Sequence, residues 1–192
     1  EDFRSDRQIE FSQLDFEGSF WDRDDVLDIL QTVVSAVTKE VRGVELATPF
    51  PRMTWHQAMD RYGSDKPDIR FGGEIVDLTD ALAGSGFAAF SSAVAAGGVV
   101  RGINAGRQEA TRSRMDALTE RAKELGAKGL VWMVVEPDES VRSSIAKFLT
   151  PDELGAIRQG LGGRPGDVLL LAADTWRTVS TVLGALRLDL GR

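Results

Sequence analysis

The chain has 192 residues, a formal net charge of −7 and no cysteine. That length allows one large domain or two small ones, and 42% hydrophobic with 28% charged residues is ordinary for a soluble globular chain. The acidic balance excludes general polyanion binding, and the lack of cysteine excludes disulfides and thiolate metal sites. The charged first residues predict no signal peptide, and apolar runs such as VLLLAA are too short to span a bilayer.

The N-terminal part predicts one strand and two helices. Residues 8–16 alternate as a strand does, which places four chemically distinct side chains on one face: Arg7, Phe11, Gln13 and Asp15. Asp22 is predicted to cap a helix with apolar residues at helical spacing, which Gly43 ends. Thr54 and Gln57 predict a capping box for a short helix that ends near Tyr62.

The C-terminal part predicts alternating strands and helices after a boundary at Gly72–Gly73. Strands are predicted at FAAF (87–90), GGVVRGINA (97–105), GLVWMVV (129–135) and VLLLAA (168–173). One helix is predicted over about residues 110–125. A second is predicted to begin after the cap Thr150, with Pro151 as its first residue and Glu153 three positions after the cap, and a third to begin after a cap at Asp174. Strands separated by helices, with many glycines, predict an α+β fold.

Two runs carry chemistry. The first, DRQIEFSQLDFE (6–17), combines a guanidinium, a flat ring, an amide and an acid. A charged strand face is usually a solvated edge, and a single aromatic residue among polar ones is usually a surface hydrophobe; only the joint match of a dozen residues to a known family favours a binding site. The second, RYGSDKPDIRF (61–71), places Asp65, Lys66 and Asp68 in a turn. These three either contact substrate or the wall of an active site, or belong to a turn held by Asx hydrogen bonds and Pro67.

Together the two runs resemble the catalytic core of bacterial-type aspartyl-tRNA synthetases. The first resembles class II motif 2, with Ile9 in place of a usual proline, and the likeness continues through the inserted GAD domain, diverging around ADTWRTVST. The resemblance implies a partial class II core at residues 1–72 and, at 73–192, a GAD-like insert with an antiparallel sheet and packed helices. It also implies a fragment, because motif 1, motif 3 and the anticodon-binding domain have no counterpart in the sequence.

The resemblance implies a role for each side chain on the charged face. Arg7 matches the catalytic arginine that reaches an ATP phosphate, Phe11 the ring that stacks on adenine, and Gln13 a glutamine at the ATP end of the site. Asp15 matches the acid that holds the ammonium group of aspartate. These types fit the chemistry, because adenylate formation needs charge neutralisation and placement.

The parent reaction implied by the resemblance joins L-aspartate to tRNA(Asp) through an aspartyl-adenylate, with ATP as substrate and Mg²⁺ as its counter-ion. Glu1 and Arg4 fall in the loop used on the tRNA acceptor end. Whether tRNA(Asn) is also a partner stays open. A cytoplasmic, homodimeric parent with no protein-bound metal is expected, and the isolated chain is expected to be inactive.

The insert has two alternative roles that the sequence leaves open. It is either a binding module for tRNA or protein, since a similar domain occurs in a tRNA-dependent amidotransferase subunit, or a brace for the catalytic core. Lys128 and Lys147 are candidates for a tRNA-facing patch. His56 is the only histidine and is predicted to lie on the surface of a short helix, which argues against a Ser–His nucleophilic pair, and GGVVRGINAG lacks the lysine of a P-loop. Trp132 is predicted to lie in the core.

Overall fold

The computed structural model describes residues 10–191, and the chain divides into two compact units at Arg52 and Met53. The first unit contains helix α1 (Arg23–Arg42), which begins and ends as the sequence predicts. The Asp22 carboxylate accepts hydrogen bonds from the Asp24 and Asp25 amides, and Gly43 ends the helix with φ +64°. None of the residues of α1 is buried.

The strand predicted over residues 8–16 is not present in its described part. Residues 10–16 belong to no strand, while residues 8 and 9 lie outside the described range. The prediction was wrong here because a strand exists only with a hydrogen-bonded neighbour, and none of residues 10–191 pairs with this segment. The alternation of side chains is real in the sequence, but alternation alone does not supply the ladder.

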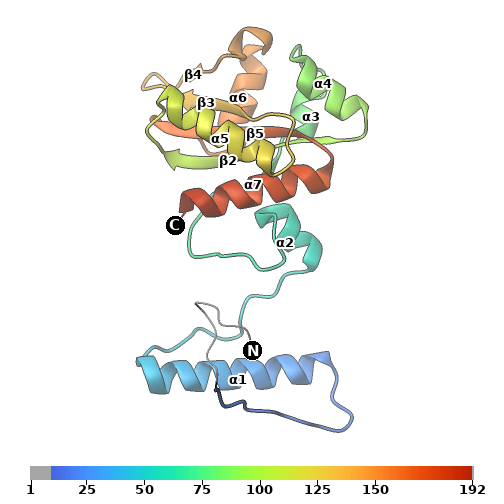
Figure 1. Ribbon diagram of the computed structural model, residues 1–192, viewed down its shortest axis with the longest axis vertical. Coiled ribbons are helices and arrows are strands. Elements are labelled where there is room, and N and C mark those ends of the chain that lie inside the picture. The colour runs from blue at the N-terminus through green and yellow to red at the C-terminus, as the bar shows by residue number, and fades with distance from the viewer. Residues whose placement is uncertain (1–9, 192) are drawn as a thin grey trace. The chain divides into compact units, whose positions relative to one another are not determined.

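The second unit is built on one antiparallel sheet of five strands (Figure 1), with the order β1-β2-β5-β3-β4. The pairing is antiparallel at every step, and a register shift interrupts the β2–β5 ladder between Asn104 and Arg107. The strands are β1 (Val76–Asp77), β2 (Val99–Arg107), β3 (Val131–Val135), β4 (Val141–Arg142) and β5 (Asp167–Asp174).

Helices cover both faces of this sheet. The helices of the unit are α2 (Trp55–Tyr62), α3 (Thr79–Leu82), α4 (Ala88–Ala95), α5 (Arg112–Glu124), α6 (Pro151–Gly160) and α7 (Trp176–Gly191), with a 3-10 turn at Ala146–Phe148. Buried side chains of α5 and α7 form one apolar cluster with the sheet, and those of α3, α4 and α6 form a second. Helix α2 packs on the side of α7 that faces away from the sheet (Figure 1).

Strand β5 lies between these two clusters. Val168 and Leu170 belong to the cluster with α5 and α7, whereas Leu169 and Leu171 belong to the other, and all four are fully buried. A strand covered on both faces needs apolar residues at every position rather than at alternate ones. The uniformly apolar run VLLLAA is therefore explained, and the fold class predicted from the sequence is confirmed.

Two local predictions in this unit were wrong. FAAF begins helix α4 instead of a strand, because its alanines and those that follow favour a helix, and Ser85 accepts a hydrogen bond from the Phe87 amide just before it. The final helix is capped by Thr175, whose hydroxyl accepts from the Thr178 amide at 3.3 Å, and not by Asp174, which ends β5. Trp132 is only partly buried, at the edge of the core.

The compact units and the predicted modules are divided at different places. Contacts group α2 and the loop after it with the sheet, so the second unit begins at Met53. The boundary predicted at Gly72–Gly73 separates the partial catalytic core from the GAD-like insert by family resemblance, and it stays a prediction. Within residues 10–191, no helix has the length and apolarity that crossing a membrane requires.

Candidate functional site

The predicted nucleotide and amino-acid ligands lie on an exposed segment of the first unit. Phe11 is 60% exposed, and Gln13 and Asp15 are also exposed. The segment meets α1 through Phe16, which lines a hollow with Trp21 and residues of the helix. A solvent-facing Phe11 is available as a platform for a flat ligand. The roles of these three residues stay predictions, and Arg7, Glu1 and Arg4 lie outside the described residues.

The GSDKPD run forms a turn directly after α2. Gly63 ends the helix with φ +67°, and the Ser64 hydroxyl accepts from the Lys66 amide at 3.1 Å. Asp68 accepts from both the amide and the guanidinium of Arg70, which holds the pKa of the Asp68 carboxyl well below its usual range. Asp68 thus makes the Asx contact of a turn, whereas the neighbouring Lys66 is exposed, as is Asp65.

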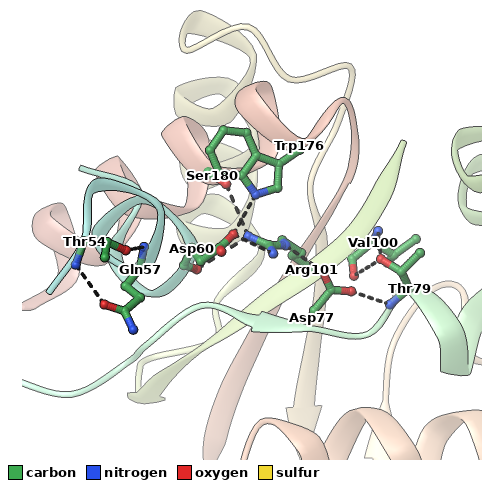
Figure 2. Close-up of polar contacts among 9 residues, drawn as sticks. All are labelled: Thr54, Gln57, Asp60, Asp77, Thr79, Val100, Arg101, Trp176 and Ser180. Atoms are coloured by element: carbon green, nitrogen blue, oxygen red, sulfur yellow. Dashed lines mark hydrogen bonds and ion pairs between the residues drawn. The ribbon is translucent and has the colours of Figure 1, made fainter. Parts of the chain in front are cut away.

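A buried arginine organises the polar contacts that join α2 to the sheet and to α7 (Figure 2). Arg101 is only 8% exposed in β2, and its Nε donates to Asp77 at 2.9 Å. Its Nη2 donates to the Asp60 carboxylate of α2, also at 2.9 Å, and its Nη1 lies 3.4 Å from the Ser180 hydroxyl of α7. Trp176 adds an Nε1–H donation to Asp60 at 2.7 Å. Four elements are thus joined through one side chain.

The carboxylates of this network are held in their charged form. Burial alone would raise the pKa of Asp60, but hydrogen bonds from Trp176 and Arg101 outweigh it, so the pKa lies below its ordinary value. For Asp77, too, burial opposes the charged form, and bonds from Thr79 and Arg101 lower the pKa. Both acids are therefore ion-pair partners and are poorly suited to accept a proton near neutral pH.

A second cluster fixes the far end of the turn. The Arg61 guanidinium donates twice to Glu74, at 2.8 and 2.9 Å, and these bonds lower the pKa of Glu74. The Tyr62 hydroxyl donates to the same carboxylate at 3.0 Å. Arg187 of α7, which is 2% exposed, lies over the rings of Tyr62 and Phe71 and donates to the Phe71 carbonyl at 2.6 Å.

This arrangement holds elements together and offers no acid–base chemistry of its own. Each carboxylate of the two clusters is paired with an arginine, and the only histidine, His56, lies among the rings of Trp55 and Trp176. One signal in the sequence could have revealed the network, namely a charged residue in the middle of the buried run VVRGINA. The partners of Arg101 were not predictable, because they lie 24, 41 and 79 positions away.

The lysines considered for a tRNA-facing patch lie on the surface of the second unit. Lys128 extends into solvent, although its ammonium group is 3.1 Å from the Asp174 carboxylate. Lys147 is exposed with its ammonium group 4.9 Å from the centre of the Phe148 ring. Because both cations are engaged by neighbours at the surface, they form no concentrated positive patch, and their role stays a prediction.

Comparison with known proteins identifies the family. The model of the class II tRNA synthetases (D, K and N) matches residues 1–171. Relatives include "Aspartate--tRNA(Asp/Asn) ligase" proteins of Moorella thermoacetica, 56% identical, and Symbiobacterium thermophilum, 50% identical, and "Aspartate--tRNA ligase" of Agathobacter rectalis, 48% identical. Each match covers 100% of this chain and 32% of the relative, so the chain spans about a third of their length. The chain belongs to the class II tRNA synthetases (D, K and N), the family that its two motif runs predicted.

Proposed function

We propose that this chain is part of an aspartate–tRNA ligase, which activates L-aspartate with ATP and transfers it to tRNA. The observation that carries the proposal is identity of 46–56% along the whole chain with bacterial proteins that have this name. Identity at this level along the whole chain argues against a different substrate for this part of the protein. The exposed segment with Phe11, Gln13 and Asp15 supports the proposal, because its side chains are free to meet a ligand.

Each side chain of the segment has one task in the proposed reaction. The aspartate carboxylate attacks the α-phosphate of ATP, and pyrophosphate leaves with the electrons of the broken P–O bond. Phe11 stacks on adenine, Gln13 contacts the nucleotide, Arg7 neutralises phosphate charge, and Asp15 pairs with the substrate ammonium. Formation of the adenylate then consists of placement and charge neutralisation, with no proton transfer required of the protein in this step.

Mg²⁺ enters this proposal only as the counter-ion of the triphosphate. Within residues 10–191, no three carboxylate or imidazole groups are close enough together to hold a metal ion. Mg²⁺ is therefore proposed only with the phosphates of ATP, and no step is assigned to a magnesium ion held by the protein alone.

The proposed partner is tRNA(Asp), contacted at its acceptor end by the loop that includes Glu1 and Arg4. Two of the relatives bear names that include both tRNA(Asp) and tRNA(Asn), and another bears a name without that addition. The proposal is therefore tested with both tRNAs. A homodimeric and cytoplasmic parent completes it, on the family resemblance alone.

A chimera tests the function directly. The stretch of the Moorella thermoacetica ligase that aligns with this chain is replaced by the chain, and aspartate-dependent exchange of pyrophosphate into ATP is measured, followed by charging of tRNA(Asp) and tRNA(Asn). We expect exchange with aspartate and none with asparagine or lysine. The isolated chain serves as the negative control. A folded chimera that activates lysine or asparagine, or no amino acid at all, would refute the proposal.

A further inference from the structure

One face of helix α7 is devoted to α2 and to the loop that follows it. The residues of this face are spaced by four, four, three and four positions, which is the spacing of a single helical stripe. We call them the α7 row: Trp176, Ser180, Gly184, Arg187 and Gly191. We propose that the α7 row sets the position of the loop 63–71, which makes the insert a positioning element for the proposed ligase reaction. The inference rests on the proposed ligase function only in the experiment that measures activity, and not in the one that measures hydrogen exchange.

The N-terminal end of the row holds α2. The indole of Trp176 donates to the Asp60 carboxylate at 2.7 Å, and the same oxygen accepts from Arg101 at 2.9 Å. The Ser180 hydroxyl, which is fully buried, lies 3.4 Å from the Arg101 guanidinium. These directional contacts fix α2 both along and across the axis of α7. Figure 2 draws the contacts that join Asp60, Arg101, Trp176 and Ser180.

The middle of the row brings two backbones into direct contact. A Cβ atom on Gly184 would lie 2.5 Å from the Tyr62 carbonyl oxygen and 2.8 Å from the Gly63 Cα. A Cβ on Gly63 would lie 1.9 Å from the Ser180 carbonyl oxygen. Only glycine at both positions allows this approach, so the start of the loop is placed against α7 with no side chain between them.

The C-terminal end of the row holds the other end of the loop. The Arg187 guanidinium lies 4.4 Å from the Phe71 ring centre and donates to the Phe71 carbonyl oxygen. A Cβ on Gly191 would lie 2.2 Å from the same ring, so the ring rests on the helix backbone. Because Gly63 and Phe71 are both held against α7, the exposed Lys66 lies in a loop that is constrained at both ends. A loop constrained at both ends loses little entropy when its exposed side chains meet a ligand.

The composition of the row argues for positioning rather than plain stabilisation. The other side of α7 is an ordinary apolar seam with Val179, Val182 and Leu186, all buried. The row instead includes two glycines and the buried Arg187. Its Nη2 donates to the Phe71 carbonyl oxygen, whereas its Nε and Nη1 are buried without a hydrogen-bond partner, which is a cost that an apolar residue would not carry. The polar contacts of the row go to the Asp60 carboxylate, the Arg101 guanidinium and the Phe71 carbonyl oxygen. Arg187 also lies over the rings of Tyr62 and Phe71, so these contacts specify where α2 and the loop lie. An apolar seam would give comparable burial with less precise placement.

The test compares two glycine-to-alanine changes in helices of the same unit. Gly184→Ala inserts a methyl group between α7 and Tyr62, whereas Gly155→Ala in α6 meets no atom within 4 Å. Alanine favours the helix in both, so α7 itself is not weakened. We expect hydrogen exchange of amides 63–74 to be roughly tenfold faster in G184A, with β2 and β5 unchanged, because opening is then local. G155A should match the unaltered chain.

The same pair is then placed in the active chimera. At a temperature where both variants are fully folded by circular dichroism, we expect G184A to lower kcat/KM for aspartate-dependent pyrophosphate exchange by about tenfold or more. The reason is that Lys66 of this loop is proposed to contact substrate or the wall of the active site, where small displacements are costly. G155A should leave it unchanged. Trp176→Phe, which removes one hydrogen bond and keeps the ring, should change both measurements in the same direction by less.

Two results would overturn the inference. One is unchanged exchange of amides 63–74 in both G184A and Trp176→Phe. The other is a loop that opens in G184A while kcat/KM stays the same. Asp189→Asn, on α7 but outside the row, controls for nonspecific effects of changing this helix. If the unaltered chimera lacks activity, the proposed ligase function fails, and hydrogen exchange on the 192-residue chain still decides whether the α7 row positions the loop.

Discussion

The guanidinium of Arg101 donates to the Asp60 carboxylate at 2.9 Å across 41 positions of sequence. Asp60 belongs to α2, in the part of the chain that the family resemblance assigns to the catalytic core. Arg101 belongs to β2, in the part assigned to the insert. The two parts therefore share one ion pair between a buried arginine and a partly exposed carboxylate, and the first two predictions concern what this ion pair stabilises.

Replacing Arg101 with methionine should destabilise the second unit moderately. The change removes charged hydrogen bonds to Asp60 and Asp77, but both carboxylates are more than two-fifths exposed and can be hydrated again. We expect the free energy of unfolding in urea to fall by about 2 kcal/mol. Lys128→Met, which removes a surface ion pair, should change it by less than about 0.5 kcal/mol. Equal effects in the two variants would show that the network contributes nothing beyond surface charge.

The network also predicts a loss of stability in acid. The pKa values of Asp60, Asp77 and Glu74 lie below their ordinary values of 3.8 for Asp and 4.5 for Glu. Their contribution is complete above those ordinary values and is lost as the pH falls through the lower pKa values of the folded state. The melting temperature should therefore drop below about pH 4. In Arg101→Met the drop should be shallower, because Asp60 keeps only Trp176 and Asp77 only Thr79 among the hydrogen-bond partners that lower their pKa values.

The Gly63→Ala variant separates backbone strain from contact with α7. The φ angles of Gly63 and of its control Gly162 are similar, at +67° and +60°. A Cβ atom added to Gly63 would collide with the backbone of α7, whereas a Cβ added to Gly162 would meet no atom within 4 Å. Both variants should lose about 1–2 kcal/mol from the left-handed conformation. Gly63→Ala should lose clearly more in urea unfolding. If the two losses are the same, the loop is free to move away from α7 without cost.

The proposed adenine platform is tested within the exposed segment. Phe11→Ala in the chimera should weaken ATP binding by about 1–3 kcal/mol, the usual contribution of base stacking, and so raise KM for ATP. Leu14→Ala is the matched control, because Leu14 is 70% exposed in the same segment and has no proposed ligand. Pyrophosphate exchange at varied ATP concentration measures both. A rise in KM from Leu14→Ala alone would move the platform to the other side of the segment.

Local signals in the sequence predicted the helix ends well. Asp22, Thr54 and Thr150 each cap a helix as predicted, because the capping hydrogen bonds reach only two or three residues ahead. The central strand was equally readable from its apolar run. FAAF was misread because a short apolar run has no period that separates a strand from a helix.

The polar network and the α7 row could not be predicted, since they depend on contacts between distant segments. The residues of the row, among them a serine, two glycines and an arginine, look unremarkable in the sequence, and their spacing acquires meaning only when α2 lies against them. The candidate ligands on residues 11–15 present the opposite case. Family resemblance indicated them from the sequence, whereas the segment forms no strand in the first unit.

The position of β5 in the sheet has a consequence for biosynthesis. β5 is the last strand in the chain, yet it pairs with both β2 and β3, which come much earlier. Until the residues up to Asp174 have emerged from the ribosome, β2 and β3 have no strand between them, and the edges with which they pair with β5 have no partner. The five-stranded sheet can therefore be completed only after its last strand has been translated, and until then the strand edges that pair with β5 are available for association with other chains.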